Sequence, residues 1–171
     1  MDNSDIKTLI DEFIAFVDTG AARSADRDQE LLMLLDSLAL AQARGCAGCG
    51  STNYPDPPDE RDPSLRKRVQ SAFKDYGYYN EVEVLRDDIA DTGVMVGDAI
   101  DDILGIYGDL REVQRRWEHN SPEDALWFFK DLYGFHWGWH LRNLQRYVHD
   151  VLFGSWRQRA TVEASDELRS E

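Results

Sequence analysis

The chain of 171 residues is poor in cysteine, in long apolar runs and in positive charge. Its only two cysteines, Cys46 and Cys49, exclude a framework of several disulfides and fit a reducing compartment. No apolar run approaches the roughly 20 residues of a membrane-spanning helix. The first residues, MDNSDIK, also lack the basic and apolar regions of a signal peptide. We therefore expect a soluble, cytoplasmic protein.

The shortage of positive charge limits the partners. Only 19 Lys and Arg stand against 33 Asp and Glu, which gives a net charge of −14 at pH 7. A surface of this sign repels phosphate backbones and anionic lipids, so neither nucleic acid nor a membrane is an expected partner. The acidity favours a basic protein partner, although it also serves plain solubility.

Helical periodicity runs through most of the chain. Apolar residues recur at spacings of three and four, and helix-start and helix-stop residues bound the stretches in which they do so. These patterns predict five helices, at residues 4–20, 24–45, 62–76, 92–118 and 121–152. The last two are separated by a short linker and should form an antiparallel hairpin. We expect an all-α fold, a single-domain bundle of about five helices that spans residues 1–155.

Three segments lie outside the predicted helices. Residues 45–63 gather Gly, Pro, Asn and Asp and are expected to form a long exposed loop. Residues 77–84 are aromatic and β-branched, which predicts an extended segment or a linker. Residues 156–171 have no apolar period and are expected to be disordered.

The last predicted helix carries two histidines. Ser121, Pro122 and Asp124 form a capping box with a proline added, which fixes where the helix starts. At 100° per residue, one apolar stripe then collects the following side chains: Ala125, Phe129, Leu132, Tyr133, His136, His140, Leu144, Tyr147 and Val151. A buried imidazole must be hydrogen-bonded, bound to a metal or turned to a cavity. We expect hydrogen-bonded core histidines, with a polar pocket and a metal site as the alternatives.

The sequence offers two alternative metal sites that include these histidines. Cys46 and Cys49 with His136 and His140 have the composition of a Cys₂His₂ zinc site, but the cysteines lie in the predicted loop and the histidines in the core. Alternatively, both histidines could face Asp102, the carboxylate nearest the apolar arc of helix 92–118, and hold a single divalent metal. The other acidic residues of that helix are expected on its opposite face: Asp98, Asp101, Asp109 and Glu112.

Two further motifs resemble those of known enzymes. Asp87, Asp88 and Asp91 resemble the magnesium-binding DDxxD element of prenyl-diphosphate enzymes, although a solvated helix start explains them as well. Arg142 and His149 have the R-x₆-H spacing of the HEPN ribonucleases and fall on one outer helix face. The acidic surface argues against RNA as a substrate for this pair.

Three stretches together resemble one protein family. They are YYNEVEVL from Tyr78, GDAIDDILGIYGDL from Gly97, and SPEDALWFFKDLYGFHWGWH from Ser121. They resemble the domain-of-unknown-function 5063 family over roughly residues 78–151, with weaker similarity in the first two helices. The resemblance implies a small all-helical bacterial protein, and it carries no activity. His136, Trp137, Gly138 and His140 match the family pattern, whereas the loop with the two cysteines does not belong to it.

The features above favour an acidic interaction protein that binds a basic protein partner, such as an inhibitor or immunity-type protein. The first alternative is a metal-dependent enzyme with His136, His140 and Asp102 in the helical core. The second is a HEPN-like ribonuclease that uses Arg142 and His149. The sequence indicates no cofactor besides a possible divalent metal.

Overall fold

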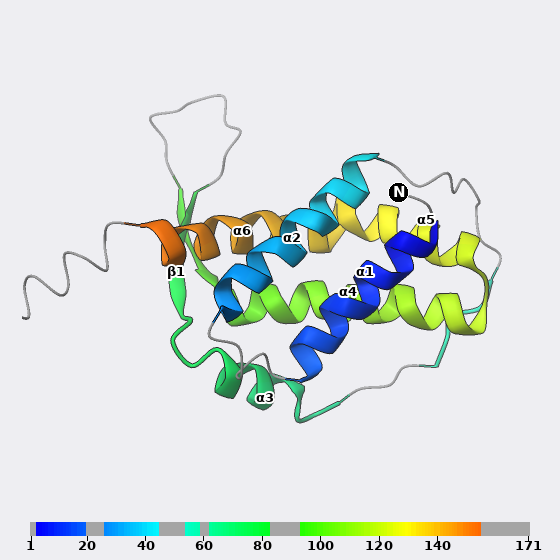
Figure 1. The fold of residues 1–171 in the computed structure, drawn as a ribbon, viewed down its shortest axis with the longest axis horizontal. Coiled ribbons are helices and arrows are strands. Elements are labelled where there is room, and N and C mark those ends of the chain that lie inside the picture. Colours follow the sequence, from blue (N-terminus) through cyan, green and yellow to red (C-terminus); the bar gives the residue numbers. More distant parts are fainter. Residues whose placement is uncertain (1–2, 20–25, 45–53, 59–61, 83–92, 155–171) are drawn as a thin grey trace, which may run out of the picture.

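The computed structural model describes residues 3–19, 26–44, 54–58, 62–82 and 93–154 (Figure 1). The elements follow in this order: α1 (Asn3–Asp18), α2 (Arg27–Arg44), α3 (Leu65–Ala72), β1 (Tyr78–Val82), β2 (Val94–Asp98), α4 (Ala99–His119), α5 (Pro122–Leu132), a π-helix η1 (Tyr133–Trp137) and α6 (Gly138–Phe153). Since α5, η1 and α6 follow one another without a break, the described chain has five helical segments. None of these helices is long and apolar enough to cross a membrane.

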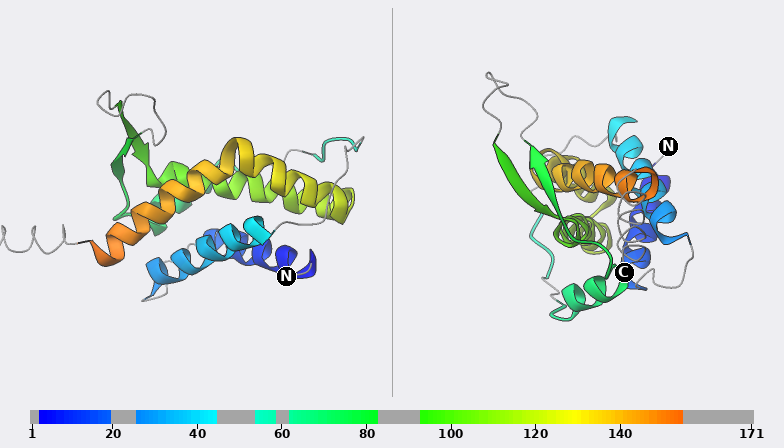
Figure 2. Two further views of the ribbon diagram at one scale, coloured as in Figure 1. Left: turned by 90° about the horizontal axis from the view of Figure 1, so that it is seen from above. Right: turned by 90° about the vertical axis from the view of Figure 1, so that its left-hand side faces the viewer.

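The helices form two layers (Figure 2). In one layer α4 runs along the molecule and α5, η1 and α6 return beside it. In the other layer α1 crosses α4 and α2 crosses α6, while α3 packs at the side of α1 and α4. The core includes these large, fully buried side chains: Trp137, Phe13, Phe73, Phe129, Ile10, Leu31, Leu35 and Ile103.

The mostly helical fold with five helical segments agrees with the expected all-α class, but it also contains a small antiparallel sheet that was not predicted. β1 pairs with β2 from Tyr78 opposite Asp98 to Val82 opposite Val94. Part of the predicted helix 92–118 is therefore a strand, and α4 begins only at Ala99. Valines and a glycine favour the strand over the helix. The carboxylate of Asp98 then caps α4, because it accepts a 3.0 Å hydrogen bond from the backbone N–H of Ile100.

The start of α5 is as predicted, but the register changes further along. The hydroxyl of Ser121 accepts a 3.1 Å hydrogen bond from the backbone N–H of Asp124, with proline in the first turn. The π-helix then adds one residue to the turn, which rotates every later side chain by about 100° relative to an uninterrupted α-helix. Trp137 becomes fully buried in the place that the α-helical period assigns to His136.

The predicted apolar stripe is confirmed at Ala125, Phe129, Leu144 and Val151, but it is wrong for His136 and it missed Trp137. His136 lies at the surface with 53% of its side chain exposed, and Leu132, Tyr133 and Tyr147 are only half-buried. The side chains that face the core after the π-helix are Trp137, Leu141, Leu144, Val148 and Val151. The indole N–H of Trp137 donates a 3.1 Å hydrogen bond to the carbonyl of Phe129, so its polar atom is satisfied inside the core.

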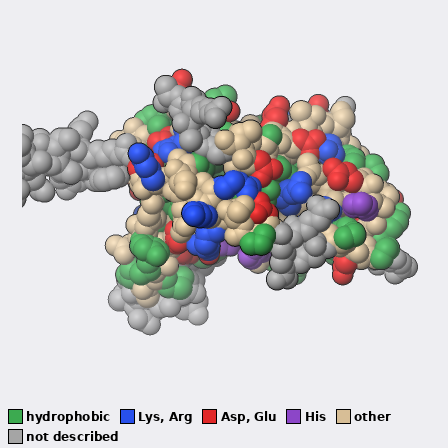
Figure 3. Space-filling view, turned by 90° about the horizontal axis from the view of Figure 1, so that it is seen from below, with side chains coloured by type: hydrophobic (Ala, Val, Ile, Leu, Met, Phe, Trp, Pro, Cys, Tyr) green, Lys and Arg blue, Asp and Glu red, His purple; other side chains and the backbone are tan. Residues whose placement is uncertain are grey.

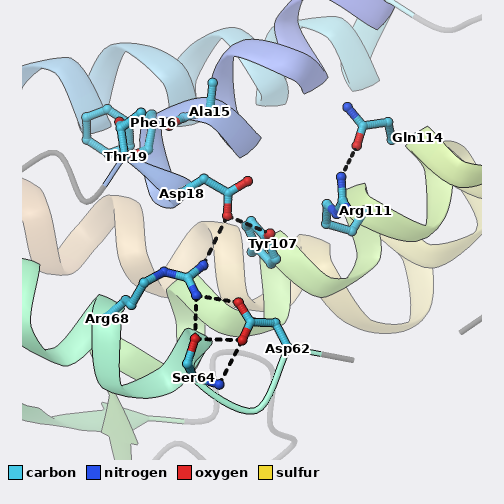
Figure 4. A network of polar contacts seen from close by, with 10 residues as sticks. All are labelled: Ala15, Phe16, Asp18, Thr19, Asp62, Ser64, Arg68, Tyr107, Arg111 and Gln114. Atoms are coloured by element: carbon cyan, nitrogen blue, oxygen red, sulfur yellow. Dashed lines mark hydrogen bonds and ion pairs between the residues drawn. The ribbon is translucent and has the colours of Figure 1, made fainter. Parts of the chain in front are cut away.

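Two polar networks hold the fold together, one between the two layers and one between α4, α5 and the preceding loop. In Figure 4 Asp18 of α1 accepts hydrogen bonds from the Tyr107 hydroxyl at 2.8 Å and from Arg68 of α3 at 3.3 Å. At the other end of α4 the buried guanidinium of Arg116 lies 3.3 Å from the ring centroid of Phe128. Arg116 also pairs with Asp56, so this described part of the loop is held against the bundle.

Candidate functional site

A chain of hydrogen bonds joins β1, α4 and α6. Nδ1 of His140 lies 2.8 Å from one carboxylate oxygen of Asp102, and the hydroxyl of Tyr79 donates a 2.6 Å hydrogen bond to the other oxygen. Because an ionised carboxylate only accepts, Nδ1 of His140 carries the proton in this pair. Asp102 is only 4% exposed and has little access to water. The two hydrogen bonds therefore satisfy oxygens that would otherwise be buried without a donor.

Two glycines make room for this chain. A Cβ atom at Gly105 of α4 would lie 2.6 Å from Cδ2 of His140, so the imidazole rests directly on the helix backbone. A Cβ atom at Gly97 of β2 would lie 2.2 Å from Cζ of Tyr79, so this ring crosses the neighbouring strand to reach Asp102. Both rings therefore depend on positions that lack a side chain.

Burial and hydrogen bonding shift the pKa values of the three groups in this hydrogen-bond chain. The hydrogen bond to Asp102 raises the pKa of His140 above its ordinary value, although burial works against this. Burial raises the pKa of Asp102, and it raises the pKa of the Tyr79 hydroxyl as well. The hydrogen bonds from His140 and Tyr79 act on Asp102 against the effect of burial, because both favour the ionised carboxylate that accepts them.

A second histidine pair lies next to the first. Nδ1 of His136 is 2.8 Å from a carboxylate oxygen of Asp109, and the rings of His136 and His140 stand edge to face with centroids 4.8 Å apart. Asp109 was expected to face away from the last helix, and this expectation is wrong. The π-helix turns His136 outward, toward the edge of α4 where Asp109 lies, and burial raises the pKa of the Asp109 carboxyl.

The structure thus brings His136, His140 and Asp102 close together, but His136 pairs with Asp109 and only His140 pairs with Asp102. Each carboxylate bonds an Nδ1 atom instead of sharing a common point with the imidazoles. Across the described ranges, no group of three or more His, Cys, Asp or Glu side chains is arranged to hold a metal ion. Cys46 and Cys49 lie outside the described residues, as do the Asp87, Asp88 and Asp91 motif and the predicted tail.

Arg142 and His149 are both exposed on α6, but each contacts other side chains. Arg142 donates hydrogen bonds to the Tyr133 hydroxyl at 2.9 Å and to Gln145 at 3.0 Å. The ring of His149 lies 5.1 Å from that of Phe153. The structure therefore shows no joint site for this pair in a single copy of the chain.

A groove between β1 and α6 is the feature that the sequence does not reveal. Its volume is about 410 Å³, and the side chains that line it include Tyr79, Glu81, Trp139, Arg142, Asn143 and Arg146. The exposed i, i+3, i+4 and i+7 spacing of Trp139, Arg142, Asn143 and Arg146 was a signal for one shared helix face. The hairpin that forms the other wall could not be placed from the sequence, because the segment before α4 was expected to be helical.

Comparison with known proteins identifies the family and the fold. The family described as Domain of unknown function (DUF5063) matches residues 3–154. The chain belongs to this family. The crystal structure of protein BF1032 from Bacteroides fragilis is similar, with a TM-score of 0.67 at 20% sequence identity over 85% of this chain and 89% of that one. At this identity the similarity concerns the fold alone, and no curated protein matches the chain.

Proposed function

We propose that this DUF5063 protein is an acidic interaction protein that binds a basic protein partner through its β1–β2 hairpin. The hairpin stands off the helical layers at one end of the molecule (Figure 2). We call residues 78–82 and 94–98 the arm. A projecting ribbon of this kind offers a partner both a face of side chains and backbone hydrogen-bonding groups along its strands.

The two faces of the arm differ, and this difference carries the proposal. Partners across an antiparallel pair share a face, so Tyr79 and Gly97 lie together on the side that packs on α6. The opposite face presents Tyr78, Val94 and Val96, whose exposed fractions are 78%, 61% and 73%. Figure 3 shows hydrophobic side chains gathered on this projecting part of the molecule, at the lower left. Grouped apolar side chains in water are typical of protein-binding surfaces.

The charge of the chain supports a basic partner. A net charge of −14 attracts positively charged surfaces over distances longer than any single contact and speeds their encounter with the arm. At the base of the arm, Asp98 lies directly opposite Tyr78 and therefore on the same face as the exposed valines. An apolar centre beside a carboxylate fits a partner surface with an apolar patch and a lysine or arginine rim.

Crosslinking in cells tests this proposal. A photoreactive amino acid placed at Val96 should give a covalent adduct with one protein of high isoelectric point, because Val96 lies in the middle of the exposed face. The matched control is Met33 of α2, which has a similar exposed fraction of 62%. Adducts that are equal at both positions, or a partner from Val96 that is acidic, would contradict the proposal.

One observation supports the metal-dependent alternative. A carboxylate on Nδ1, as at His136 and His140, is the arrangement that orients a metal-binding histidine in many metalloproteins. The two Nε2 atoms are then the available metal ligands. Transition-metal sites in proteins use three or four protein ligands, so these two are too few by themselves. Elemental analysis separates the proposals, because stoichiometric zinc, iron or manganese that is lost in His140→Gln would favour the metal enzyme.

A further inference from the structure

The groove between β1 and α6 combines charges and aromatic rings that the proposed interaction surface does not use. It lies between α6 and β1, and residues 79–82 of β1 form its wall on the arm, whereas Val94 and Val96 of β2 do not line it. Its volume of about 410 Å³ lies within the range of roughly 300–1,000 Å³ that is typical of small-molecule sites.

Two arginines on α6 face this groove without a carboxylate partner. Arg142 bonds only to the neutral side chains of Tyr133 and Gln145, and no ion pair joins Arg142 or Arg146 to another described residue. Other arginines of the described ranges are paired with carboxylates: Arg27, Arg66, Arg68, Arg115 and Arg116. In a chain with 33 acidic residues, two arginines one helical turn apart that form no ion pair with another described residue favour an anionic group at this place, although Asp150 also lines the groove.

Aromatic and acceptor groups complete the site. Trp139 is 50% exposed and lies one turn before Arg142 and Asn143 on the same face of α6, so its indole offers a flat surface beside the arginines. From the other wall comes Glu81, whose Oε1 is buried and has no hydrogen-bond donor among the described residues. A buried carboxylate oxygen of this kind calls for an N–H or O–H donor.

We propose that this groove binds a nucleoside monophosphate. The phosphate lies between Arg142 and Arg146, the base stacks on Trp139, and an amino or hydroxyl group of the nucleoside donates to Glu81. Guanine fits Glu81 best among the bases, because it presents two adjacent N–H donors to one carboxylate. The net charge of −14 repels a long polyanion but opposes a single phosphate between two guanidinium groups far less.

Calorimetric titration with GMP tests the proposal. We expect saturable binding of GMP with one site, at least tenfold weaker binding of guanosine and of inorganic phosphate, and no gain in affinity for a ten-nucleotide RNA. The double variant Arg142→Gln, Arg146→Gln and the single variant Trp139→Leu should each weaken GMP binding at least tenfold. All three side chains lie at the surface, so the variants should fold, and thermal unfolding of each variant checks this.

The matched control is Arg66→Gln, which removes an arginine with a half-exposed side chain (52%) on α3, outside the groove. This variant should bind GMP as the parent does. An equal loss in the control, equal affinity for guanosine and GMP, or tighter binding of the RNA would each overturn the proposal. Absence of any heat with GMP, at concentrations up to the millimolar range and at low salt, would overturn it too.

Discussion

Valine side chains are buried in the helical layers but exposed on the arm. Val148 of α6 is fully buried, whereas Val96 of the arm is 73% exposed. In the layers apolar side chains meet one another and leave water, which is the main source of folding free energy. On the outward face of the arm they gain nothing of this kind, because no described element covers them. The layers thus supply the stability of the fold, and an exposed apolar face on the arm is what the proposed partner contact requires.

The largest effect is expected in the layers. Phe129 is fully buried and its ring lies 5.0 Å from that of Trp137, at the place where the register changes. Phe129→Ala should lower the free energy of unfolding by roughly 3–5 kcal/mol, because it removes apolar contacts and leaves a cavity. Urea unfolding measures this difference. If Phe129→Ala lowers the free energy of unfolding by less than about 1 kcal/mol, burial in the layers does not stabilise the fold as we expect.

A smaller effect is expected where the arm joins the layers. His140→Gln removes the donor to buried Asp102 and should cost about 1–3 kcal/mol of unfolding free energy. The matched control is His136→Gln, which changes an exposed side chain and should stay within about 0.5 kcal/mol of the parent. If His140→Gln instead unfolds like the parent but loses a bound metal or ligand, the pair is a functional site and not a structural one.

The same pair should make stability depend on pH. The pKa of His140 is raised in the folded state by its bond to Asp102, above an ordinary value of 6.5. Its contribution is therefore fully present below about pH 6.5 and is lost as the pH rises through the raised value. The urea midpoint of the parent should fall between about pH 6 and 9, and that of His140→Gln should fall less. Identical pH profiles for the two proteins would show that this bond is not formed in solution.

The smallest effect on stability is expected on the arm. Val96→Ala should change the free energy of unfolding by less than about 0.5 kcal/mol, because the side chain is already in water. Val148→Ala, the same substitution in the core, should cost about 2 kcal/mol. Partner binding should show the reverse order, with a loss for Val96→Ala alone. A strongly destabilised Val96→Ala protein would mean that the outward face of the arm is part of the core.

Much of the helical architecture could be predicted because it follows from local chemistry. Ser121 with Pro122 and Asp124 marks the start of α5, and the capping bond is present. Apolar spacing of three and four likewise located α1, α2 and α4, since a helix needs only one continuous apolar face to pack. A hydrogen-bonded histidine was expected, and the alternative metal site set His140 near Asp102; the structure shows a direct hydrogen bond between these two residues.

What the sequence alone determined about this protein is its acidity, its helices and their caps, since all of these depend on residues close together in the chain. Tertiary structure decided the rest. The π-helix shifts His136 outward and Trp137 inward, because packing against α4 outweighs the regular α-helical period. It also decided the strand at Val94–Asp98, because a strand exists only through a paired partner, here Tyr78–Val82. The groove and the Tyr79–Asp102 bond depend on that pairing, and the Asp102–His140 bond depends on the packing of α4 against α6, so the three residues meet although they lie up to 61 positions apart in the sequence.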